Sequence, residues 1–280
     1  MSYQRMEKIG LSILASAVFL VTLSGCGSAE KNSDSSHPYN AYYKDANLMY
    51  FGTYEQDNNT KNGPEPIQWE ILDTNENGTL LLSCNVLEMC SFTDNPIMDN
   101  RSVTWENSDL RKWLNNDFYN EAFSAIEKQQ INTVTLSNPT KPNRDKPCIE
   151  GVDTQDKVFC LSMDEIEKYF HCSATRDTGC AYYPDSIAGI SEYLVRKDNE
   201  DGVSQLDTHV FSIDDLKNND WGFDESVLGF RSGEWYTRSV TDDCEDQSIV
   251  RVSALGLTGW GFPGVRNPEN GIRPAIYIKQ

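Results

Sequence analysis

Eight cysteines give this 280-residue chain its widest range of chemistry, because thiols form disulfides, bind metals and act as nucleophiles. Cys26 lies in an N-terminal segment that is treated separately below. The other seven are an odd number, so at least one must lack a disulfide partner within the chain. Short loops bring two pairs near each other, and the candidate disulfides are therefore Cys84–Cys90 and Cys172–Cys180.

Metal sites have weaker support in the sequence. His171, Cys172 and Cys180 could ligate zinc, but there is no pair of cysteines two residues apart to support such a site. The acidic run 198–202 (Asp-Asn-Glu-Asp-Gly) supplies the hard oxygen ligands that calcium prefers, although its spacing does not match an EF-hand. We therefore expect no metal cofactor, with calcium as the alternative.

Adjacent carboxylates could perform acid and base catalysis of glycoside cleavage. Two such pairs are Asp214-Asp215 and Asp242-Asp243. The chain has 43 acidic residues, so neighbouring acids are common by chance and a solvated surface is the favoured interpretation. The sequence also contains no Gly-x-Ser-x-Gly elbow and no phosphate-binding loop. No catalytic residue is predicted.

Aromatic and arginine side chains gather in the C-terminal third. Flat aromatic faces stack on sugar rings or on apolar side chains, and a guanidinium supplies forked donors beside them. A glycine-rich segment carries Trp260, Phe262 and Arg266, and we expect it to be an exposed loop. Trp235 and Arg238 are further candidates for ligand binding, with a structural role in the core as the alternative.

The charge balance excludes several classes of protein. The chain has 24 Lys and Arg against 43 Asp and Glu, a net charge of -19, so phosphate backbones would repel it and no nucleic-acid partner is expected. Hydrophobic residues make up 38% of the chain, which is enough for a real core and excludes a disordered acidic tail. A mean hydropathy of -0.56 excludes a polytopic membrane protein.

The N-terminus has the layout of a secretory signal peptide. Arg5 and Lys8 precede the apolar run 9–23, which is short for a membrane span. Leu23-Ser24-Gly25-Cys26 resembles the bacterial lipobox, so we expect residues 1–25 to be removed and Cys26 to be lipidated. The alternative is an uncleaved anchor helix. Either a lipid anchor or an anchor helix would hold the rest of the chain at a membrane, outside the cytoplasm. The polar residues 26–40 would form a flexible tether.

Residues 41–280 are predicted to form a single α+β domain with short strands, a few short helices and long irregular loops. Asn77-Gly78 is a strong hairpin signal, and Ser108, Ser124 and Ser162 are typical of helix N-caps. Long loops are expected at 141–151 and 175–220, with one short helix near 187–194. The predicted strands are 48–54, 67–72, 79–84, 131–136, 157–161, 249–253 and 272–278.

The order of several motifs resembles the bacterial surface domain catalogued as domain of unknown function 6273. The resemblance implies a C-type-lectin-like architecture shared with sulfatase-modifying enzymes. It does not bring their formylglycine-generating activity, because only Cys244 lies beyond Cys180 where a reactive pair is needed. The family's Trp-Trp-Leu-Arg-Ser motif corresponds to residues 235–239 and departs from it at two positions. The motifs that carry the resemblance are Tyr50–Asn59, Pro66–Asp73, Leu80–Ser83, Thr104–Asn115, Ala122–Ser124, Asp156–Phe159 and Gly271–Ile276.

Together these features predict a lipid-anchored cell-surface protein that binds a glycan or an envelope protein. The alternative is an extracytoplasmic enzyme that acts on envelope material by carboxylate acid and base chemistry. A third hypothesis is a structural surface protein without a small ligand. A shallow surface with exposed Trp260 and Phe262 would favour binding, whereas a pocket lined by two carboxyl groups of raised pKa would favour the enzyme.

Overall fold

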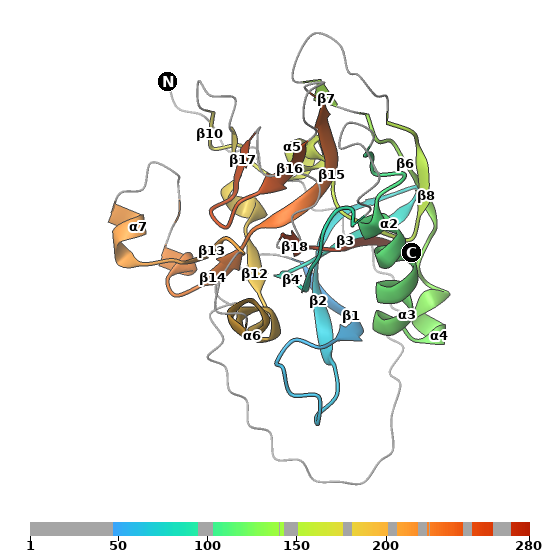
Figure 1. The fold of residues 1–280 in the computed structure, drawn as a ribbon, viewed down its shortest axis with the longest axis horizontal. Helices are drawn as coiled ribbons and strands as arrows, with labels where there is room; N and C mark the ends of the chain where they lie inside the picture. The colour runs from blue at the N-terminus through green and yellow to red at the C-terminus, as the bar shows by residue number, and fades with distance from the viewer. Residues whose placement is uncertain are drawn as a thin grey trace, which may run out of the picture. The chain divides into compact units, whose positions relative to one another are not determined.

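The computed structural model describes residues 47–94, 103–139, 141–142, 151–175, 181–200, 206–217, 223, 225–242, 248–259 and 270–280. All of these residues belong to one compact unit (Figure 1). Within them the fold is mixed α+β, with most residues of regular structure in sheets and only short helices. The predicted fold class is therefore confirmed at this level.

The first sheet contains the N-terminal strands and the C-terminal strand. Its second strand shows why the sequence folds this way: Ile67 and Trp69 are fully buried, whereas the intervening Gln68 is partly exposed, as the two-residue period of a strand requires. The strands β1, β2 and β3 are consecutive antiparallel neighbours. In spatial order the described strands of this sheet are β1 (Leu48–Tyr54), β2 (Glu65–Asn75), β3 (Gly78–Ser83), β19 (Ala275–Ile278) and β9 (Val158–Phe159).

The second sheet is centred on β15, the long strand that contains the Trp235–Ser239 motif. It joins the first sheet through the short segment between β18 and β19, in which Arg273 and Pro274 interrupt the strand that the sequence predicts as continuous. Its described strands run in the order β10 (Ala174–Thr175), β11 (Ala181–Tyr182), β17 (Leu257–Gly259), β16 (Ser248–Val252), β15 (Trp235–Asp242), β18 (Gly271–Ile272) and β5 (Glu88–Met89), and β7 (Lys141–Pro142) also pairs with β15.

Two smaller sheets complete the strands of the described residues. In the larger of them β12 pairs in parallel with β4, which brings residues about a hundred positions apart into register. Its strands run in the order β13 (Thr208–Val210), β14 (Arg231–Gly233), β12 (Ala188–Ile190) and β4 (Asn85–Val86), and the other sheet pairs β6 (Val134–Leu136) with β8 (Thr154–Asp156).

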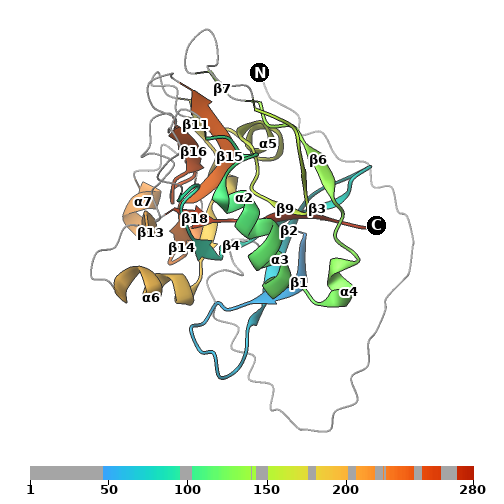
Figure 2. The ribbon, with the colours of Figure 1, turned by 45° about the vertical axis from the view of Figure 1, so that its right-hand side comes forward.

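The helices are short, and their starts follow the predicted caps. Ser108, Ser124 and Ser162 each accept a hydrogen bond from a backbone N–H in the first turn, and the latter two form complete capping boxes. Figures 1 and 2 show α2, α3 and α4 on one side of the β1–β2 hairpin and α6 on the other. The described helices are α2 (Asp109–Trp113), the π-helical η2 (Leu114–Phe118), α3 (Tyr119–Ala122), α4 (Ala125–Lys128), α5 (Met163–Tyr169), the 3-10 helix η3 (Pro184–Ser186), α6 (Glu192–Glu200), α7 (Ile213–Lys217) and the 3-10 helix η4 (Glu225–Val227).

The region from 175 to 220 differs most from the prediction. The expected helix near 187–194 is wrong, because Ala188–Ile190 forms strand β12 and the helix begins only at Glu192. Ser191 explains the boundary, since its hydroxyl accepts a hydrogen bond from the Leu194 N–H at 3.2 Å and so caps α6. This segment is therefore an ordered strand and helix, and both contribute to the site described below.

Two glycines with positive φ provide a test of the first sheet. Gly78 has a φ of 115°, and a Cβ built on it would lie 2.1 Å from the carbonyl oxygen of Ile278 in the neighbouring strand. Gly63 has a φ of 80° but nothing within 4 Å of such a Cβ. Gly63→Ala should therefore cost about 1–2 kcal/mol of backbone strain alone. Gly78→Ala should cost a further 1–3 kcal/mol or so of steric strain. Urea unfolding of both variants measures this difference, and equal losses would contradict the packing described here.

Candidate functional site

An open groove with a volume of about 460 Å³ lies beside the β1–β2 hairpin. This volume falls within the roughly 300–1,000 Å³ typical of sites for small molecules. One side is lined by residues of the hairpin, and the other by residues of α6 and the start of β14. The groove is lined by Tyr50, Gln56, Asp57, Glu65, Pro66, Gln68, Asn85, Ile190, Ser191, Glu192, Val195, Gly229 and Arg231.

Gln56 joins the hairpin to the other elements of the groove. Its side-chain amide donates to the carbonyl of Pro66 at 3.3 Å and accepts from the Asn85 amide at 3.2 Å. Its backbone carbonyl accepts from the N–H of Tyr193, the second residue of α6, at 3.0 Å. One residue of the hairpin loop therefore fixes the distance from the hairpin to both β4 and α6.

An ion pair holds the far end of α6. The Lys197 ammonium lies 2.6 Å from Glu88 Oε1, and the Tyr54 hydroxyl donates to Glu88 Oε2 at 3.1 Å. Glu88 is in β5 and Tyr54 ends β1, so the pair ties the helix to two strands. Because the lysine is partly exposed, solvent screens the pair and its main effect is to position the helix.

The floor of the groove comes from the parallel pairing of β4 and β12. Asn85 is in register with Gly189, and Ile190 pairs with Val86. Ile190 is almost fully buried, so only part of its side chain can face the groove. The Oδ1 atom of Asn85 is buried and has no hydrogen-bond partner among the described residues.

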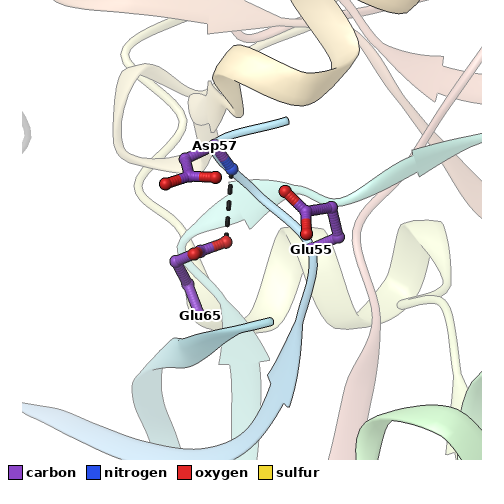
Figure 3. A group of neighbouring side chains, drawn as sticks. All are labelled: Glu55, Asp57 and Glu65. Atoms are coloured by element: carbon purple, nitrogen blue, oxygen red, sulfur yellow. Dashed lines mark hydrogen bonds between the residues drawn. The ribbon is translucent and has the colours of Figure 1, made fainter. Parts of the chain in front are cut away.

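Three carboxylates gather at the loop of the hairpin (Figure 3). One oxygen each from Glu55, Asp57 and Glu65 lies within 4.8 Å of the others, and this is the one such acidic, histidine or cysteine cluster among the described residues. Glu65 accepts from the backbone N–H groups of Gln56 at 2.8 Å and Asp57 at 3.2 Å. Backbone donors therefore hold the carboxylates together, and Glu65 closes the loop that they belong to.

The groove combines one exposed aromatic face with many polar groups. Tyr50 is 65% exposed, and its hydroxyl accepts from the Gln68 amide at 3.2 Å, which fixes the ring on the hairpin wall. The remaining lining residues offer amides, carboxylates, a hydroxyl and the guanidinium of Arg231. An aromatic face beside fixed donors and acceptors is suited to a polar ligand with flat faces, such as a sugar.

Trp235 and Arg238, proposed from the sequence as ligand-binding residues, are structural instead. Trp235 is fully buried, and its indole N–H donates to the Ser186 carbonyl at 3.2 Å. Arg238 is 4% exposed, and all five of its N–H donors are occupied: by Glu165, by Asn138 and by the carbonyls of Ser137 and Cys160. Neither side chain has a surface or a donor left for a ligand.

Other predicted residues lie outside the described part of the chain. Trp260, Phe262 and Arg266 belong to this group, as does the lipidation site Cys26. The proposals that rest on them remain untested predictions. None of the described helices is long and apolar enough to cross a membrane.

The described cysteines are thiols, so the structure does not contain the predicted Cys84–Cys90 disulfide. The reason is that the two side chains face different parts of the core: Cys84 belongs to the cluster around Tyr182 and Phe211, whereas Cys90 packs against the main core. Burial raises the pKa of Cys84 to about 12, which makes this thiol a poor nucleophile. Cys180, the predicted partner of Cys172, lies outside the described residues.

The predicted metal alternatives are not assembled in the described residues. Asp198–Glu200 forms the end of α6 rather than a loop. The other two residues of that run lie outside the described part, as does Cys180 of the zinc alternative. The acidic cluster at the hairpin loop is thus the described group whose donor type suits a hard cation.

The acid pairs singled out in the sequence do not line the groove. The Asp214 side chain is 82% exposed and pairs with Lys217, while Asp215 accepts from the Ser212 N–H and lies 3.2 Å from His209. Asp242 ends β15, and Asp243 lies outside the described residues. The carboxylates of Asp214 and Asp215 therefore belong to a helix start and an exposed surface.

The carboxyl groups with raised pKa lie away from the groove. Burial raises the pKa of Glu70 and raises that of Glu234 to about 7, although the nearby Arg273 and Arg251 act in the opposite direction. Glu234 is 1% exposed, pairs with Arg251 and accepts from the Asp207 N–H at 3.1 Å. Neither carboxyl group lines the groove, so neither can act as an acid on a ligand there.

The raised pKa of Glu234 predicts a pH dependence of stability. A folded-state pKa of about 7, above the usual 4.5 of a glutamate in an unfolded chain, means that folding favours the protonated carboxyl. This contribution is fully present below about pH 4.5 and is lost as the pH rises through about 7. Glu234→Gln should remove that loss, so its melting temperature should change less with pH than that of the unsubstituted protein. If the melting temperatures of the two proteins change with pH by the same amount, the raised pKa of Glu234 is contradicted.

Sequence reasoning missed most of the groove. The sequence patterns predict neither the turn structure of the loop 55–62 nor the helix cap at Ser191. Two signals could have found them: Asp57 and Asn59 are typical of a tight turn, and Ser191 precedes a run with helical spacing. No local signal predicts that residues near 190 and 230 approach the hairpin, because that depends on long-range strand pairing.

The comparisons with known proteins support one assignment. No curated protein and no solved structure matches the chain. The family described as "Domain of unknown function (DUF6273)" matches residues 76–280, which is more than half of the chain. The match begins after β1 and β2, so the hairpin wall of the groove lies outside it. The chain therefore belongs to the DUF6273 family.

Proposed function

We propose that this protein is a lipid-anchored, outward-facing binding module and that the groove beside the β1–β2 hairpin holds a glycan. The anchor rests on the lipobox-like Leu23–Cys26 and the apolar run before it. The binding role rests on one observation: a groove of about 460 Å³ that combines an exposed tyrosine and other apolar surface with several hydrogen-bonding side chains. The C-type-lectin-like architecture implied by the resemblance forms part of the same proposal.

The hydrogen-bonding side chains of the lining favour a sugar over an apolar ligand. Amides from Gln56, Gln68 and Asn85 offer both donors and acceptors at fixed positions, and hydroxyl groups of a sugar can use either. The Tyr50 ring presents a flat surface for the apolar face of a sugar ring. Pro66, Val195 and the almost fully buried Ile190 supply the aliphatic part of the lining, which can pack against the apolar face of a sugar ring.

An extracytoplasmic enzyme is the second candidate, and the site favours it less. A glycosidase needs one protonated carboxyl group beside the substrate and a second carboxylate across from it. The hairpin carboxylates are near one another, but Glu65 accepts two backbone hydrogen bonds. A carboxylate that already stabilises a turn as an acceptor is poorly placed to donate a proton.

Tyr50 is the residue to change in testing the groove. Glycan-array binding by the purified full-length protein identifies a ligand, and the affinity of the Tyr50→Ala variant is then measured by calorimetry. We expect a loss of about tenfold, because about 1.4 kcal/mol corresponds to tenfold and stacking on one aromatic ring is of that size. Ile126→Ala is the matched control, since Ile126 is 75% exposed on α4, away from the groove. Equal affinities for the two variants would exclude this groove as the glycan site.

The anchor has its own test. Cys26→Ser removes the thiol that would carry the lipid, so the protein should move from the membrane fraction to the soluble or secreted fraction. Cys172→Ser makes the same substitution in the body and should leave the protein with the membranes. A Cys26→Ser protein that still sediments with membranes and resists alkaline extraction would exclude the lipid anchor in favour of another attachment.

A further inference from the structure

We infer that the ligand of the groove carries protonated amino groups, so that glycans with free amino sugars are bound in preference to the same glycans in acetylated form. The inference rests on the proposed function and specifies the class of ligand.

The groove carries an excess of negative charge. Three of its lining residues are acidic, Asp57, Glu65 and Glu192, against one basic residue, Arg231. Among the described residues no lysine, arginine or histidine forms an ion pair with any of these carboxylates. The carboxylate of Glu88 differs from them, because it forms an ion pair with Lys197 of α6. The groove carboxylates thus remain available to a cation from outside.

The hairpin loop keeps its like charges close together. Glu55, Asp57 and Glu65 have oxygens within 4.8 Å of one another, so their negative charges repel one another. Hydrogen-bond donors hold them in place: the Asn59 N–H donates to both Glu55 and Asp57, and the Asn62 amide donates to Asp57 at 2.8 Å. These donors are neutral, so they stabilise the arrangement without cancelling its charge. An ammonium group beside the loop would relieve the repulsion.

The shape and the floor of the groove indicate a cation attached to a larger molecule. A volume of about 460 Å³ is far greater than one ion fills, and the Tyr50 ring lines the same space. Asn85 lines the groove together with Gln56 and Gln68, and the side-chain oxygens of such amides can accept from a ligand N–H or O–H. A sugar ring with a protonated amino group provides the cation, the donors and the apolar face together.

The test compares the glucosamine tetramer with the N-acetylglucosamine tetramer by calorimetry at about pH 6, using the full-length protein. We expect the glucosamine tetramer to bind about tenfold more tightly, and we expect the difference to shrink as salt rises. The double variant Asp57→Asn with Glu65→Gln keeps an acceptor oxygen at each position but removes both charges, and it should lose most of the preference. Glu76→Gln with Glu106→Gln removes two exposed charges elsewhere and should keep it.

Each outcome decides the inference. Equal binding of the two tetramers, or binding of a neutral glycan alone, overturns the preference and leaves the proposed function standing. Binding of no glycan at all overturns both. An equal loss of preference in the two double variants would show that the net charge of -19, rather than the groove, attracts the amine, and this also overturns the inference. Melting temperatures confirm that the variants are folded before affinities are compared.

Discussion

One fully buried arginine, Arg273, holds together the parts of the chain on which the groove depends. Its guanidinium donates to the carbonyl of Ser83 at 2.7 Å and to that of Ser186 at 2.9 Å, and it lies 5.1 Å from the centre of the Trp235 ring. Glu70 completes the group at 3.7 Å. Burying a guanidinium costs several kcal/mol unless it is paired and hydrogen-bonded. The fold is therefore stable only when the segments that contain Ser83, Ser186 and Glu70 all lie beside Arg273. The arginine therefore joins the first sheet, the second sheet and the turn that leads into β12.

The groove follows from that junction. Ser83 ends β3 and is followed by β4, and Ser186 ends the turn before β12, so fixing both carbonyls sets the two strands that form the floor. The hairpin then needs only Gln56 to align it with this floor and with α6. Arg273, Arg238 and Trp235 thus lie beneath the surface, whereas the groove is lined by a different set of residues, many of them on the hairpin. For Trp235 and Arg238, the structural role that the sequence offers as the alternative is the one observed.

Local patterns predicted local structure well. The turn at Asn77-Gly78 and the caps at Ser108, Ser124 and Ser162 lie where the sequence placed them, because each depends on residues three or four positions apart. The site could not be predicted in this way. Tyr50, Asn85 and Arg231 meet only through pairings between distant strands, and the burial of Trp235 and Arg238 depends on the same pairings. The family match does not help, since it excludes the hairpin wall.

The proposed function places the ligand in the groove between the β1–β2 hairpin and α6. Hydrogen–deuterium exchange of the full-length protein, with and without saturating glucosamine tetramer, locates the contact directly. If the tetramer binds in the groove, amide exchange should slow in the segments that line it, residues 50–68, 190–195 and 229–231. Slower exchange confined to other parts of the chain, with these three segments unchanged, would contradict this placement.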